Sequence, residues 1–291
     1  GVIDEDPMDY NGHGTHCAGT VAGVIGGGYP GYRGGIVGVG PTLTVVNLKV
    51  MTKDGWGYFS WAMSALYYAV VNGIDVASMS FGGYVNTSIK THQGLYNALL
   101  RLTNWACTNG LVMVASTGNE NYDMGAIKPY RHIPSDLPCV IAVTGTDIWN
   151  NKASYSNYGD CLHGIAAPGG DPSATPPLWH PVQPPAWRYW YAFVLSTWSP
   201  LSVIPGFYGA VYVWMTGTSA AAPHVAGVAG LIRSRYPGFN PEMVRIALQI
   251  GALDIGKPGY DLYFNYGLVN AYQPLIQRGP YGNLRMHLVP I

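Results

Sequence analysis

Residues 111–116 read Leu-Val-Met-Val-Ala-Ser, and residues 139–144 read Cys-Val-Ile-Ala-Val-Thr. Each is a short apolar run of strand length, and the first follows the turn-forming pair Asn109-Gly110. Continuous runs of this kind are typical of strands that are buried on both faces of a sheet. The segment from Ile89 to Thr108, which leads into the first run, predicts a helix. The two strands and this helix together predict a sheet that is covered by helices.

The same alternation extends in both directions along the chain. Helices are expected at His13–Ile25, Tyr58–Val71, Ile89–Thr108, Thr218–Arg235 and Pro241–Ile250, and strands at Leu43–Val50, Asp75–Met79, Leu111–Ser116 and Cys139–Thr144. Repeated strand–helix–strand order predicts an α/β fold with a mostly parallel sheet and helices on both faces. Because active sites of such sheets lie at the carboxyl ends of strands, we expect functional residues just after Met79 and just after Ser116.

The composition excludes several classes of protein. The 291 residues contain 15 Lys+Arg and 15 Asp+Glu, so the formal net charge is zero. A surface for nucleic acid or anionic membranes carries a basic excess, so neither partner is expected. With 48% hydrophobic residues the chain can bury a large core, which excludes disorder. The most apolar stretch, residues 189–215, is broken by Pro200 and Pro205, so no membrane span is predicted.

Three short motifs on three predicted elements carry residues suited to catalysis. His13 opens a helix in the run Asn-Gly-His-Gly-Thr-His (11–16), and histidine is the simplest general base near neutral pH. Asn119 follows a strand in Ser-Thr-Gly-Asn (116–119), where its amide can donate to a developing oxyanion. Ser219 opens a helix of small residues. Taken singly, each has a purely structural interpretation as a capping histidine, a turn asparagine or an N-cap serine.

A zinc site built on His13 and His16 is the weakest alternative. The two histidines are three positions apart, and no glutamate of the His-Glu-x-x-His type accompanies them. We therefore predict no metal ligands here.

Taken together, the motifs resemble those of the subtilisin-like serine proteases, the subtilases. His-Gly-Thr-His-Cys-Ala-Gly-Thr (13–20) is similar to the family's histidine motif, Thr-Gly-Asn (117–119) to its oxyanion motif, and Gly-Thr-Ser-Ala-Ala-Ala-Pro-His-Val-Ala-Gly (217–227) to its serine motif. The order of the motifs also agrees. The stretches at 77–83 and 154–159 match further landmarks of the family, so the resemblance runs from about residue 9 to residue 271.

The resemblance implies a role for each motif. Ser219 would be the nucleophile, His13 its general base and acid, and Asn119 an oxyanion donor together with the backbone N–H of Ser219. It also implies two edges that hold an extended peptide substrate. These edges are Ser80, Phe81 and Gly82 on one side and Gly55, Trp56 and Gly57 on the other. His16 and His224 would be structural.

One family residue has no match in this sequence. Subtilases carry the triad aspartate at the end of the first core strand, in a run such as Val-x-Asp-Thr/Ser-Gly several dozen residues before the histidine. Only twelve residues precede His13, and their aspartates Asp4, Asp6 and Asp9 do not fit that pattern. We therefore expect the aspartate in a segment or separate chain N-terminal to this sequence. Three explanations are open for the absence of this aspartate: the chain is a fragment, it is one piece of a cleaved protease, or it is a degenerate homologue.

The remaining predictions concern organisation and setting. We expect an N-terminally incomplete peptidase domain at residues 1–272, with a Pro-rich and aromatic insertion at about 170–212 that includes a β-hairpin, and a tail at 273–291. The family resemblance implies a disulfide between Cys139 and Cys161, a core position for Cys17, and structural calcium without assignable ligands. No other cofactor is required.

Two functions are considered. The leading hypothesis is a secreted endopeptidase that acts on peptide or protein substrates. The alternative is a non-catalytic subtilase-fold module of an extracellular assembly.

Overall fold

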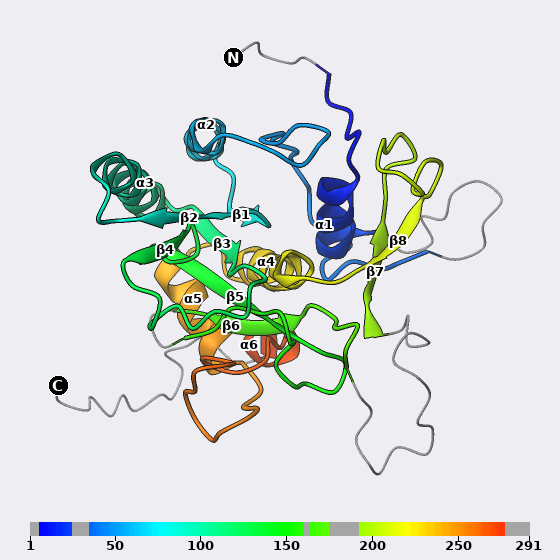
Figure 1. Ribbon diagram of the computed structural model, residues 1–291. Helices are drawn as coiled ribbons and strands as arrows, with labels where there is room; N and C mark the ends of the chain where they lie inside the picture. The colour runs from blue at the N-terminus through cyan, green and yellow to red at the C-terminus, as the bar shows by residue number, and fades with distance from the viewer. Residues whose placement is uncertain (1–5, 25–34, 160–162, 175–191, 277–291) are drawn as a thin grey trace.

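The computed structural model describes residues 6–24, 35–159, 163–174 and 192–276 (Figure 1). Its centre is a sheet of four parallel strands in the order β1-β3-β5-β6. These are β1 (Val76–Met79), β3 (Val112–Ser116), β5 (Val140–Thr146) and β6 (Ile165–Pro168). The strands predicted at 75–79, 111–116 and 139–144 are confirmed to within two residues.

Helices cover both faces of this sheet, as the α/β prediction requires (Figure 1). Successive side chains of β3 point to opposite faces. Val112 and Val114 pack in the cluster formed with α4 (Thr218–Arg235) and α5 (Pro241–Ile250). Met113 and Ala115 pack in a second cluster, formed with α2 (Phe59–Val71) and α3 (Lys90–Thr108). Burial on both faces explains why this strand is apolar throughout.

The helix boundaries follow local capping signals. The bounds of α4 and α5 are those predicted, and the Asn240 side chain caps α5 by accepting from the backbone N–H of Met243 at 2.9 Å. α1 (His13–Ala22) begins at the predicted histidine but ends at Ala22, before the predicted end at Ile25. A last short helix, α6 (Tyr272–Ile276), spans the predicted boundary between the peptidase domain and the tail at residue 273.

Two small antiparallel sheets flank the central one. β2 (Gly83–Asn86) pairs with β4 (Tyr130–Ile133), a pairing that the sequence did not predict. β7 (Val194–Thr197) pairs with β8 (Tyr212–Met215), which confirms the predicted aromatic hairpin. Most of the Pro-rich part of the insertion falls at 175–191, outside the described residues.

The hairpin holds the N-terminal part of α1 in place. The hydroxyl groups of Ser196 and Thr197 donate to the carbonyls of His16 and Thr15, each at 2.8 Å. Gly12, just before the helix, has a φ of 109° and is so close to Trp198 that a Cβ there would lie 2.1 Å from the indole. Glycine is therefore required at position 12, and the hairpin positions the helix that carries His13.

The strand predicted at Leu43–Val50 is wrong. This segment forms no β-ladder with any described strand, and Val45 and Val46 are 47% and 51% exposed. Its β-branched residues favour a strand, but a strand needs a neighbour to satisfy its backbone, and none lies beside it among the described residues.

Within the described ranges, every helix is too short or too polar to cross a bilayer.

Candidate active site

Ser219 lies in the first turn of α4, at the carboxyl-terminal edge of the sheet. Its carbonyl accepts a hydrogen bond from the hydroxyl of Ser80, one residue beyond β1, at 2.8 Å. Ser80 directly follows β1, and Asn119 lies three residues beyond the end of β3. The positive end of the α4 dipole favours negative charge beside Ser219.

Asn119 is held with its amide N–H₂ group free to donate. Its side-chain oxygen accepts from the backbone N–H of Thr218 at 2.8 Å and from the Thr218 hydroxyl at 3.0 Å. A Cβ built on Gly217 would lie 3.2 Å from Ser219 Oγ and 3.4 Å from Asn119 Nδ2. The hydroxyl and the amide therefore lie close to the same point above Gly217, where a carbonyl group could present its carbon to the hydroxyl and its oxygen to the amide.

His13 is the first residue of α1, and this helix packs against α4. One turn further on, the Cys17 thiol donates to the Ser219 carbonyl at 3.6 Å, so the His13 end of α1 adjoins the Ser219 end of α4. Burial lowers the pKa of His13, and the negative charge of Asp9 opposes this by raising it. The imidazole is thereby favoured in the neutral form that a general base needs.

Neither Asp6 nor Asp9, the two candidate aspartates among the described residues, forms a hydrogen bond with His13. Asp9 accepts four hydrogen bonds at 2.7–2.9 Å from the backbones of Asn11, Gly12 and Thr15 and from the Thr15 hydroxyl. Burial acts to raise the pKa of Asp9, but these bonds outweigh it and lower the pKa. The Asp9 carboxylate thus satisfies backbone N–H groups around the start of α1, whose N-cap residue is Gly12. Asp6 accepts from Met8 and Tyr10, and Asp4 lies outside the described residues.

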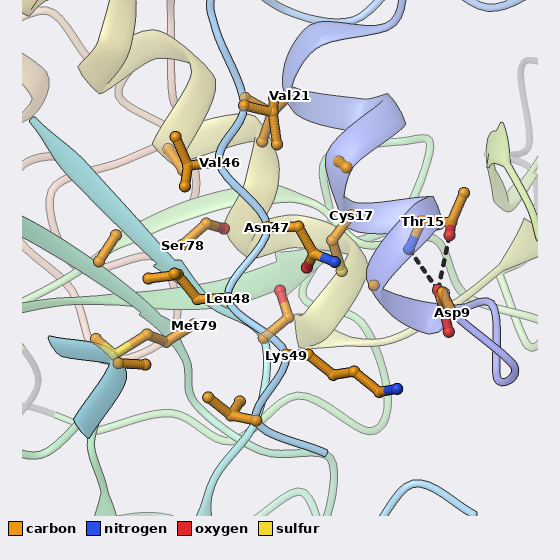
Figure 2. Close-up of a pocket in the computed structure, with 18 of the residues that line it drawn as sticks. Asp9, Thr15, Cys17, Val21, Val46, Asn47, Leu48, Lys49, Ser78 and Met79 are labelled. Atoms are coloured by element: carbon orange, nitrogen blue, oxygen red, sulfur yellow. Dashed lines mark hydrogen bonds between the residues drawn. The ribbon is translucent and has the colours of Figure 1, made fainter. Parts of the chain in front are cut away.

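A large cavity separates the unpaired segment 43–50 from β1 (Figure 2). Its volume is about 1460 Å³. Val46 and Leu48 line one wall, Ser78 and Met79 the other, and Cys17 and Val21 of α1 the end, as Figure 2 shows. His13 also lines it. β1 pairs on its other side with β3 alone, so both backbone edges facing this cavity are unpaired among the described residues.

The two predicted substrate edges lie around the same region. Ser80, Phe81 and Gly82 continue directly from β1 and line the cavity, as does Gly55. Gly55 and Trp56 belong to a tight turn closed by a 2.7 Å bond from the Thr52 N–H to the Trp56 carbonyl, and Trp56 is 79% exposed. A Cβ on Gly57 would lie 2.3 Å from the Val50 carbonyl, which explains the glycine at this position.

A polar cluster beside Asn119 was not predicted. Asn157 donates to Glu120 at 3.0 Å and to Tyr84 at 2.6 Å, and the Tyr84 hydroxyl donates to Glu120. A Cβ on Gly118 would collide with both Asn157 and Glu120, so this glycine brings the cluster against the oxyanion segment. Of the three residues in this cluster, only Asn157 lies in a stretch whose sequence matches the family, residues 154–159.

His16 and His224 occupy structural positions. His16 is fully buried and bonds the Val194 carbonyl at 3.1 Å, and His224 bonds the Ala220 carbonyl at 3.0 Å. The thiol of Cys17 is buried, which raises its pKa to about 11. No group of three metal-ligating side chains occurs within the described part of the chain.

We expect the protein to lose stability in mild acid because of two buried histidines. Burial lowers the pKa of both His16 and His132 from about 6.5 to about 4. The unfolded chain binds a proton on each histidine below pH 6.5, whereas the folded protein does so only near pH 4. The free energy of unfolding therefore falls as the pH is lowered from 6.5 to 4. At pH 4.5 the loss is about 2–3 kcal/mol for each histidine, measured by urea unfolding.

His132→Gln should remove about half of this pH dependence between pH 6.5 and 4.5, because the contribution of His16 remains. A free energy of unfolding that is constant across the window would contradict the prediction.

Comparison with known proteins agrees with this geometry. A model of the Subtilase family of peptidases matches residues 3–267. The chain belongs to the subtilase family. Among curated relatives, it is 34% identical to thermitase from Thermoactinomyces vulgaris over 270 residues, covering 93% of this chain and 77% of that protein. It is 32% identical to subtilisin DY from Bacillus licheniformis over 262 residues, with 90% and 77% coverage.

Solved structures also share the fold of this subtilase. A lanthipeptide protease superposes with a TM-score of 0.74 at 28% identity, covering 92% of this chain and 75% of that one. A protease from Pseudoalteromonas arctica PAMC 21717 gives 0.69 at 31% identity, with 90% and 70% coverage. The predicted family and fold are therefore confirmed, and they support a serine protease function for this subtilase.

Proposed function

We propose that this subtilase is a secreted endopeptidase that hydrolyses peptide bonds through an acyl-enzyme on Ser219. The single observation that supports this most is the convergence of Ser219 Oγ and Asn119 Nδ2 on the space above Gly217. A non-catalytic module would have no need to anchor the Asn119 oxygen on Thr218 and leave the amide free. The test is hydrolysis of an unfolded protein such as casein, with Ser219→Ala as the control.

In the proposed reaction, His13 accepts the Ser219 hydroxyl proton as the oxygen attacks the substrate carbonyl carbon. The negative charge that develops on the carbonyl oxygen is stabilised by the Asn119 amide and the backbone N–H of Ser219. His13 then gives the proton to the departing amine, leaving an acyl group on Ser219. Water, deprotonated by His13, releases the acyl group as a carboxylic acid and regenerates the serine.

We propose further that the triad aspartate comes from a strand outside the present sequence, expected N-terminal to it. Three observations support the cavity beside β1 as its place. The cavity is lined by apolar residues such as Val46 and Met79, and it extends to His13. Within the described ranges, the backbone edges of its two long walls are unpaired. A strand seated there would pair with both edges, and an aspartate at its end could hold the His13 imidazole.

The proposed substrate is an extended peptide. Ser80–Gly82 and Gly55–Gly57 offer backbone edges on which such a peptide would add as a strand, gaining affinity from main-chain hydrogen bonds. An extracellular location belongs to the same proposal; the low content of charged residues, 10%, is its support.

Asn119→Leu is expected to lower kcat by about 10²–10³-fold, because an interaction made mainly in the transition state is lost. KM for a peptide substrate should change little. Thr218→Val keeps the amide but removes the hydroxyl that anchors it, so a smaller loss of kcat is expected. Steady-state kinetics on the protein that carries the proposed strand measure both. An unchanged kcat in Asn119→Leu would contradict the assignment.

A further inference from the structure

Two cysteines meet on the face of the molecule covered by α3. Cys107 lies in the last turn of α3, and Cys139 is the residue before β5. Both are half-buried at the margin of the apolar cluster that α2 and α3 form with the sheet. They are far apart in sequence, and the packing of α3 against the start of β5 brings them together.

The contacts of Cys139 place its sulfur over α3. Its thiol lies 3.4 Å from the side-chain oxygen of Asn104. Asn104 and Cys107 are three positions apart on the helix, so they share one face. Cys107 and Cys139 also line the same small cavity of about 40 Å³, together with Glu242 and Arg245 of α5. Residues of α3, of the start of β5 and of α5 thus line the same cavity.

The electrostatics show that the two thiols act on each other directly. Burial and, after it, the hydrogen bond to the Cys139 thiol raise the pKa of Cys107 to about 12. The charge of Glu242 adds to this effect, and that of Arg245 opposes it. Cys107 is therefore protonated at neutral pH and is a poor nucleophile by itself, so its oxidation to a disulfide needs both an external disulfide oxidant and the neighbouring Cys139 thiol.

We propose that Cys107 and Cys139 form a reversible disulfide that ties the end of α3 to the start of β5. With a small disulfide such as oxidised glutathione as oxidant, one thiolate attacks it to give a mixed disulfide and one glutathione thiolate. The second cysteine then attacks the mixed disulfide, the protein S–S bond forms, and a second glutathione leaves. The two cysteine protons end on the two glutathione molecules. This inference does not depend on the proposed protease activity.

The pairing can be read directly because every cysteine falls on a different tryptic peptide. Cys107 lies on residues 102–131, Cys139 on 132–152, Cys161 on 153–188 and Cys17 on 1–33. The folded protein is equilibrated with oxidised glutathione, blocked with N-ethylmaleimide, digested and analysed by mass spectrometry. We expect a linked pair of peptides 102–131 and 132–152, lighter by two hydrogens than their sum and released by dithiothreitol.

The double variant Cys17→Ser/Cys161→Ser is the matched control and should keep this link, whereas Cys107→Ser should abolish it. Oxidation should also raise the Tm by roughly 5–10 °C, reversed by dithiothreitol and absent in Cys107→Ser. A link between 132–152 and 153–188, which the family resemblance implies, would overturn the proposal. So would maleimide labelling of both Cys107 and Cys139 after equilibration with the oxidant.

Discussion

Replacing Ser219 by alanine, in the protein that carries the proposed Asp-bearing strand, is expected to lower kcat for peptide hydrolysis by about 10⁶-fold, the loss typical of removing the nucleophile of a catalytic triad. The oxyanion donors remain, so a rate above that of the uncatalysed reaction should persist. Ser219 is in the first turn of α4, and its carbonyl, which Ser80 bonds, is unaffected by the change. The fold should therefore be preserved, and steady-state kinetics measure the effect.

Ser80→Ala is the matched control, because it removes a hydroxyl from the same region without removing the nucleophile. Its loss of activity should be far smaller than that of Ser219→Ala. Equal losses in the two variants would show that disruption of α4, and not loss of a nucleophile, explains the result.

Supplying the proposed strand is expected to have the second-largest effect. The full chain is extended at its N-terminus by a segment that ends in a Val-x-Asp-Thr-Gly strand. A second form carries asparagine in place of the aspartate. The aspartate form should have a kcat about 10⁴-fold higher, because an asparagine cannot fix the imidazole tautomer or stabilise the imidazolium.

Seating of the strand is measured separately from catalysis. Backbone amides of residues 43–50, which pair with no described strand, should exchange more slowly with solvent in both extended forms. Slow exchange with equal activity of the aspartate and asparagine forms would contradict the role of the aspartate. Unchanged exchange in both forms would contradict the proposed seat.

The sequence predicted two kinds of element: strands that are continuous apolar runs, and helices whose ends are marked by local capping residues. β3 and β5 are buried on both faces, so their composition alone identifies them. α4 and α5 begin at local signals, such as the Asn240 cap, that are independent of distant residues. The histidine, asparagine and serine motifs were found for the same reason, since each is a short run with its own chemistry.

What the sequence could not predict depends on contacts between distant segments. The anchoring of Asn119 by Thr218 joins residues 99 positions apart. The hairpin that holds α1 through Ser196 and Thr197 acts over some 180 positions. Leu43–Val50 was mistaken for a buried strand because its composition is that of one, while pairing depends on a neighbour that local sequence does not reveal.

Reaction with a fluorophosphonate tests the central claim most directly, because the reagent phosphonylates only a serine activated by a neighbouring base. The protein with the Asp-bearing strand is treated, digested with trypsin and analysed by mass spectrometry. Ser219 lies on the peptide of residues 189–233. We expect the label on Ser219 and its loss in His13→Ala. An unmodified Ser219, under conditions in which the strand is seated, would contradict the proposal that this subtilase works through a serine nucleophile.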